Sequence, residues 1–166
     1  CGSLMMEGTT MSRRQDHFRM EEDLQKDFED LIRQNKGIKL VAVSAQNVDR
    51  MVTIFKAALR TGMIFVIDLY GAHFLEQISQ YAKIPYPCEN YRNLRVFFSH
   101  EMMKRLYARG RKDIVRKFGP FEIKLPEIAQ NPGSHIFLFR NGLLPDIKKL
   151  GDFTDSAFVW SLFEGY

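Results

Sequence analysis

The sequence has little of what metal, nucleotide and covalent-catalysis sites are usually built from. Its two cysteines, Cys1 and Cys88, do not form a CxxC pair, so we expect neither a disulfide framework nor a zinc knuckle. Its four histidines are scattered singly, without the HxH or HxxxH spacing that begins a zinc site. It also lacks a GxGxxG loop, a Walker A loop and a GxSxG elbow. These absences predict a chain with no metal site, no cofactor and no complete catalytic apparatus of its own.

Long apolar runs are absent as well. No run reaches the roughly 18 residues that a membrane-spanning helix needs, and no signal peptide is visible. With so few cysteines, a reducing compartment fits best, so we expect a cytoplasmic protein without a membrane partner. Residues 1–3 resemble a vector remnant. Apolar runs stop abruptly at both ends, which predicts that residues 4–166 are one domain cut from a larger protein.

The composition is that of a soluble domain with an uneven charge. The 166 residues are 45% hydrophobic and 27% charged, which suits one globular domain with its own core. The net charge is +4, but residues 1–37 carry a surplus of acidic groups and the remainder a surplus of basic ones. This tilt permits a polyanionic partner without requiring one.

Two periodicities alternate along the chain. Continuous apolar runs predict buried strands at 38–43, 63–67, 94–98, 136–139 and 157–162. Apolar residues at helical spacing predict helices at 18–36, 48–59, 72–82, 101–118 and 143–150. The alternation predicts a three-layer, Rossmann-like α/β domain with helices on both faces of a mainly parallel sheet of about five strands. Ligands of such sheets bind at the carboxyl ends of the strands.

The turn after the first predicted strand is one candidate site. Backbone amides at the start of a helix attract anions, and Ser44 and Asn47 could add hydrogen bonds to a ligand. Arg50 lies about one turn further on. The alternative is an ordinary helix cap followed by an exposed arginine.

The turn after the second predicted strand is another candidate. Asp68, Tyr70 and His73 bring a carboxylate, a phenol and an imidazole to the carboxyl end of that strand, where they could bind or catalyse. The alternative is that Asp68 caps the next helix, Tyr70 packs and His73 lies on the surface.

A basic helix is the third candidate. Residues 101–118 contain seven lysines and arginines but only two acidic residues. Such a helix can lie along a phosphate backbone. The alternative is a solvated amphipathic face. The cations are Lys104, Arg105, Arg109, Arg111, Lys112, Arg116 and Lys117.

Five short motifs in a fixed order resemble the β-CASP domain of metallo-β-lactamase-fold hydrolases, most closely the ribonuclease J-like and exonuclease-like group. The resemblance covers nearly the whole chain. The motifs are Glu7-Gly8-Thr9-Thr10, residues 44–50, Asp68-Leu69-Tyr70, Phe139-Arg140 with residues 143–146, and Phe163-Glu164-Gly165-Tyr166.

The resemblance implies an insert that clamps nucleic acid over the active site of a nuclease. In that family, two zinc ions are bound by the metallo-β-lactamase domain, and this chain contains none of their ligands. Glu7 matches an acidic residue that pairs with a later catalytic histidine. Ser44, Asn47, Arg50 and Arg140 match segments that face the cleft. The implied partners are RNA or another single-stranded nucleic acid and the metallo-β-lactamase domain of the same protein.

Three functions follow from these patterns. The first is the substrate-clamping half of a zinc-dependent nuclease, inactive by itself. The second is a non-catalytic interaction domain that docks through its basic helix. The third is an α/β domain that binds a small ligand at its strand ends. Substrate identity, endo- or exonuclease action, assembly into a homo-oligomer and the state of the flanking hydrolase domain stay open.

Overall fold

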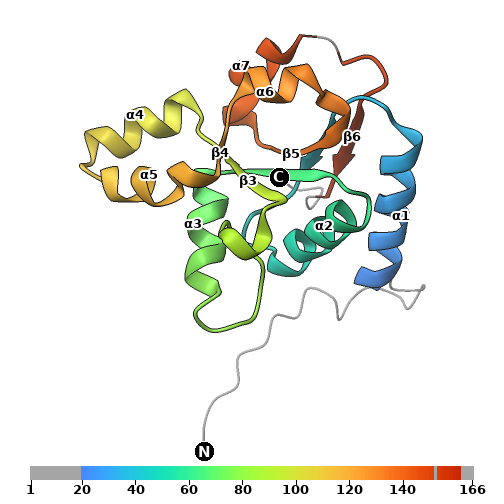
Figure 1. The fold of residues 1–166 in the computed structure, drawn as a ribbon, viewed down its shortest axis with the longest axis horizontal. Coiled ribbons are helices and arrows are strands. Elements are labelled where there is room, and N and C mark those ends of the chain that lie inside the picture. Colours follow the sequence, from blue (N-terminus) through green and yellow to red (C-terminus); the bar gives the residue numbers. More distant parts are fainter. Residues whose placement is uncertain (1–19, 152, 162–166) are drawn as a thin grey trace, which may run out of the picture.

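The computed structural model describes residues 20–151 and 153–161, which form an α/β domain around one sheet (Figure 1). The strands are β1 (Lys39–Ala42), β2 (Ile64–Asp68), β3 (Leu94–Phe97), β4 (Glu122–Ile123), β5 (His135–Phe139) and β6 (Ala157–Trp160). All described strands pair in parallel, in the order β4-β3-β2-β5-β1-β6. The predicted parallel α/β architecture is confirmed, with six strands where about five were expected.

Helices cover both faces of the sheet and complete three layers (Figure 1). One face contacts α1, α2, α3 and α5, and the other contacts α6 and α7. This arrangement explains the continuous apolar runs, because central strands covered on both faces bury every side chain. The helices are α1 (Glu21–Gln34), α2 (Val48–Arg60), α3 (Leu69–Ile78), α4 (His100–Ala108), α5 (Lys112–Phe118), α6 (Leu125–Gln130) and α7 (Leu144–Ile147).

Short polar residues set where the helices on the carboxyl side of the sheet begin. The Asn47 side chain accepts from the Arg50 amide and caps α2, and the Asp68 side chain accepts from the Gly71 amide and caps α3. A capping side chain satisfies an amide that has no partner inside the helix. Both helices therefore start near the carboxyl edge of the sheet, where a site was expected: α3 directly after β2, and α2 after the intervening residues 43–47 that follow β1.

The sheet has a topological switch point between β1 and β5. These strands are neighbours in register, with Lys39 opposite Ile136 and Ala42 opposite Phe139. The helix after β1 is α2, on one face, whereas the helix after β5 is α7, on the opposite face. The two connections diverge and leave a crevice at the carboxyl ends of β1 and β5, where ligands of doubly wound sheets bind.

The predicted helix over 101–118 is wrong in one respect. The segment forms two helices, α4 and α5, which meet at Gly110, and Gly110 has a φ of +69°. That left-handed backbone suits glycine and turns the chain back, so the basic side chains lie on a helical hairpin. The sequence patterns also gave no sign of β4 or α6, which are two and six residues long.

Candidate functional site

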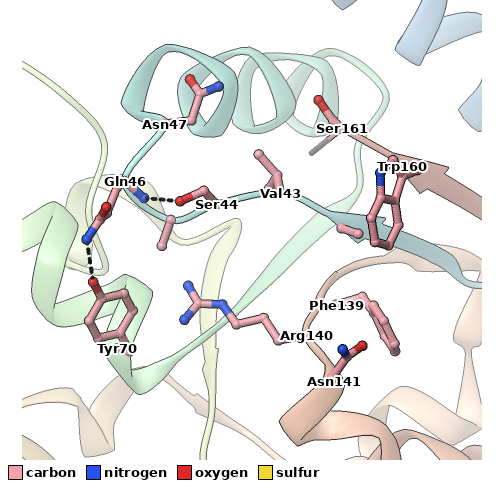
Figure 2. Close-up of a pocket in the computed structure, with 12 residues that line it drawn as sticks. Val43, Ser44, Gln46, Asn47, Tyr70, Phe139, Arg140, Asn141, Trp160 and Ser161 are labelled. Atoms are coloured by element: carbon pink, nitrogen blue, oxygen red, sulfur yellow. Dashed lines mark hydrogen bonds between the residues drawn. The ribbon is translucent and has the colours of Figure 1, made fainter. Parts of the chain in front are cut away.

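A cavity of about 630 Å³ occupies the switch point (Figure 2). It is lined by segments that follow β1, β5 and β6, and by Tyr70 in the first turn of α3. Because β2, β5, β1 and β6 are consecutive in the sheet, their carboxyl ends reach one edge together. The side chains that matter most below are Ser44, Gln46, Asn47, Tyr70, Arg140 and Trp160.

The turn after β1 forms one wall of the cavity. The backbone N–H of Gln46 donates to Ser44 Oγ at 3.3 Å, and the side-chain Nε2 of Gln46 donates to the Tyr70 hydroxyl at 3.1 Å (Figure 2). Asn47 Oδ1 accepts from the Arg50 amide at 3.1 Å, which leaves the two N–H groups of its side-chain amide for other acceptors. The capping role that the sequence allowed for this turn is present, and the turn also lines a cavity.

Arg140, directly after β5, is held in place on two sides. Its Nη1 lies 3.3 Å from Asp68 Oδ2, and its guanidinium carbon lies 4.8 Å from the centre of the Tyr70 ring. The Nη2 atom is buried and has no hydrogen-bond partner among the described residues. Figure 2 shows the guanidinium between the Ser44–Gln46 turn and Tyr70. The arginine therefore offers one preoriented donor that the described protein does not use.

Asp68 forms the ion pair that orients Arg140. Its side chain is only 6% exposed, and Oδ1 accepts from the Gly71 amide at 2.8 Å. Burial raises the pKa of the Asp68 carboxyl, while the Arg140 guanidinium and the Gly71 amide oppose that rise. Asp68 and Tyr70, named from the sequence as candidate site residues, thus contact Arg140 and fix its direction.

Arg50 does not line this cavity, although the sequence grouped it with Ser44 and Asn47. Its Nη2 lies 3.1 Å from Glu21 Oε1, and its Nη1 donates to the Ser161 hydroxyl. The side chain is 23% exposed, so the exposed arginine that the sequence suggested is largely covered. Arg50 therefore links α1, α2 and the segment after β6, and its contacts hold these parts of the fold together.

Trp160 is a prominent lining residue that sequence reasoning missed. It ends β6, is 51% exposed, and lies across the cavity from Tyr70 in Figure 2. In the sequence it looked like one more apolar residue of a buried strand. Its exposure follows from the sheet order, because β6 pairs with β1 and is the edge strand on that side.

The remaining predicted site residues lie elsewhere. The basic side chains of α4 and α5 are exposed on the hairpin beyond β3 and do not line the cavity. His73 lies on α3 with its Nδ1 3.7 Å from Glu76 Oε2. Glu7 falls outside the described residues, as do both predicted severed ends. The described residues contain no cluster of three or more His, Cys, Asp or Glu suited to a metal ion, and no helix among them could span a membrane.

Comparison with family models, curated proteins and solved structures gives no match for this chain. The β-CASP resemblance therefore stays a prediction from sequence motifs. The case for a function depends on the geometry of the switch-point cavity.

Proposed function

We propose that the switch-point cavity holds a phosphate group of a single-stranded nucleic acid, RNA in the first instance. The chain would then be the nucleic-acid-binding domain of a larger metallo-β-lactamase-fold hydrolase. The cavity's place at the switch point supports a ligand there. The choice of a phosphate comes from the donors around it, and the choice of a nuclease comes from the sequence resemblance.

The observation that carries the proposal is the buried Nη2 of Arg140, which has no hydrogen-bond partner in the part of the chain that the structure describes. A buried N–H group without a partner costs about 1–3 kcal/mol, a cost that a bound oxyanion would remove. Asp68 and Tyr70 hold the guanidinium in one direction, so little side-chain entropy is lost when a phosphate oxygen binds. An arginine fixed in this way suits the phosphate, whose recognition does not depend on base sequence.

Two further features of the cavity fit a nucleotide. The start of α2 faces it, and the positive end of a helix dipole favours an anion. Trp160 presents a half-exposed aromatic ring on the other side, on which a base could stack. Phosphate and base would thus be bound at opposite walls, by Arg140 and by Trp160.

Catalysis would belong to another part of the parent protein. The described residues offer no cluster that could hold the two zinc ions implied by the resemblance. We therefore assign this chain binding and positioning of the strand, and no step of hydrolysis.

The cavity volume favours one second candidate. About 630 Å³ lies within the range of small-molecule sites, so a free phosphorylated metabolite would also fit. The two candidates differ in length dependence. A strand gains affinity as an oligonucleotide grows from about 4 to about 16 nucleotides, the span of sites on single-strand-binding domains. A small phosphorylated ligand would bind as tightly as the longest oligonucleotide.

The test compares labelled RNA oligonucleotides by fluorescence anisotropy over a salt series. Asp68→Asn is the reference, and Asp68→Asn with Arg140→Gln is the test variant, because the pair of changes leaves no buried carboxylate unpaired. Loss of one charge-assisted hydrogen bond of about 1.5–3 kcal/mol predicts roughly 10- to 100-fold weaker binding. The salt slope should fall by about 0.7, the value for one single-strand contact.

Arg92→Gln is the matched control for the loss of a positive charge. Arg92 is 84% exposed and precedes β3, so it lies at the amino edge of the sheet, away from the cavity. This variant should bind RNA like the wild-type chain. Equal affinity and equal salt slope for the Asp68→Asn protein with and without Arg140→Gln would overturn the proposed function.

A further inference from the structure

The α4–α5 hairpin concentrates the positive charge of the molecule. Residues 100–118 contain seven lysines and arginines and two carboxylates, a net of +5, whereas the whole chain has a net charge of +4. The rest of the chain is therefore slightly acidic. A local excess of this size on a surface attracts polyanions over a distance of about one Debye length, roughly 8–10 Å at ordinary salt.

Most of these cations form no ion pair among the described residues. Arg105, Arg111 and Lys117 form ion pairs, with Glu101, Asp113 and Glu76 respectively. The other four cations are exposed and have no ion-pair partner among the described residues. They are Lys104, Arg109, Lys112 and Arg116.

Packing explains the shape of the hairpin but not its charge. Ile114 and Phe118 of α5 are buried against the core, whereas α4 has no fully buried residue. In Figure 1, α4 and α5 lie together at the end of the domain opposite α1 and β6. Tyr107 is also 48% exposed, with Lys112 Nζ 5.7 Å from its ring centre. A solvated amphipathic face needs charges of both signs for solubility, and a local excess of one sign suits the steering of an oppositely charged partner.

The hairpin begins at the same sheet edge as the cavity. α4 starts at His100, shortly after the carboxyl end of β3. Only β2 separates β3 from β5, so the two strand ends are about 10 Å apart at ordinary strand spacing. The four unpaired cations lie beyond the start of α4, so a chain of phosphates that leaves Arg140 along this edge would reach them only after its first few nucleotides.

From this placement we infer that the α4–α5 hairpin is a second contact surface for the nucleic-acid strand, separate from the switch-point cavity. The inference rests on the proposed function, since it extends the path of the same strand. The cavity fixes one nucleotide. The hairpin binds the backbone further along through Lys104, Arg109, Lys112 and Arg116, without reading its sequence.

The test replaces all four unpaired cations with glutamine, as Lys104→Gln, Arg109→Gln, Lys112→Gln and Arg116→Gln in one chain. The matched control removes four exposed charges elsewhere, as Lys26→Gln, Lys56→Gln, Lys83→Gln and Arg92→Gln. Both proteins should keep the wild-type melting temperature. Binding of RNA of about 4 and about 16 nucleotides is then measured over a salt series.

The hairpin variant should bind the short RNA like the control, but the long RNA about tenfold or more weakly at low salt. Its salt slope for the long RNA should fall by up to about 3, or 0.7 for each lost contact. Binding of the long RNA equal to that of the control would overturn the inference. So would an equal loss on both lengths, since the hairpin would then not be a separate surface.

Two other outcomes separate this inference from the proposed function. If the hairpin variant loses only long-RNA binding while Arg140→Gln in the Asp68→Asn background changes nothing, the hairpin stands and the cavity proposal fails. If polyglutamate of equal charge displaces the long RNA as well as unlabelled RNA does, the hairpin recognises acidic protein segments, and the inference is overturned.

Discussion

Replacing Arg140 with glutamine, while Asp68 stays in place, is expected to destabilise the fold. The change leaves the Asp68 carboxylate buried with the backbone amides of Gly71 and of Asp68 itself as its remaining polar partners among the described residues. Removing one member of a buried ion pair is costly because the other charge keeps its desolvation penalty. Asp68→Asn should cost less, since its partner Arg140 is 29% exposed and can be hydrated.

The size of the effect follows from the burial of the two side chains. Breaking a buried pair costs about 3–5 kcal/mol, and the partial exposure of Arg140 points to the lower end, about 3 kcal/mol. A loss of that size lowers the melting temperature of a domain this long by about 6–12 °C. For Asp68→Asn we expect about 1 kcal/mol, because the asparagine oxygen can still accept from the Gly71 amide.

The loss of stability in Arg140→Gln should depend on pH, because Asp68 is titratable. Burial raises the pKa of Asp68 above its ordinary value of 3.8. In Arg140→Gln the guanidinium that opposes this rise is gone, so the pKa of Asp68 should be higher than in the wild-type chain. A group whose pKa is raised on folding contributes stability below its unfolded pKa and loses it as the pH rises through the folded value. The deficit of Arg140→Gln relative to the wild-type chain should therefore be largest near neutral pH and shrink toward pH 3.8.

Urea denaturation of the wild-type, single-variant and double-variant chains at about pH 7.5 and about pH 4.5 measures these differences. Adding Asp68→Asn to Arg140→Gln should restore part of the stability at the higher pH. A deficit that is the same at both pH values, or a double variant no more stable than Arg140→Gln alone, would refute the reasoning.

Three further predictions follow from single positions. Lys39 is 1% exposed and burial lowers its pKa, so wild-type stability should rise with pH from that lowered value up to 10.5. Urea midpoints of Lys39→Met should lack this rise. Gly133→Ala would place Cβ 2.1 Å from a backbone carbonyl oxygen and should cost about 1–3 kcal/mol in thermal denaturation. Gly142→Ala, whose new Cβ would have no described atom within 4 Å, should cost far less. Trp160→Ala should weaken oligonucleotide binding by about 1–3 kcal/mol, whereas Phe158→Ala, equally exposed but outside the cavity, should not.

The parts of the fold that could be predicted are those with a strong local signal. Every apolar run singled out in the sequence overlaps a strand, because strands of a covered parallel sheet are apolar on both faces. The convergence of Ser44 and Arg140 followed from the same topology, since carboxyl ends of parallel strands share one edge. Position along a strand was therefore enough to expect Arg140, which the resemblance had singled out, at the same edge as Ser44.

The parts that could not be predicted depend on tertiary contacts. β4 is two residues long and has no periodicity to detect. The ion pair between Asp68 and Arg140 depends on which way two distant side chains point, which the sequence does not specify. The same holds for Trp160, whose exposure depends on β6 being an edge strand, and for Arg50, which turns toward Glu21 and away from the cavity.

The central claim is that a nucleic-acid phosphate binds at the switch-point cavity. Titration of the isotope-labelled chain with RNA of about 4 nucleotides, followed by amide and side-chain NMR, tests it most directly. We predict shift changes concentrated at residues 44–47, at Arg140 and at the Trp160 indole. Shift changes confined to residues away from the cavity, with Arg140 and Trp160 unchanged at saturation, would contradict the claim.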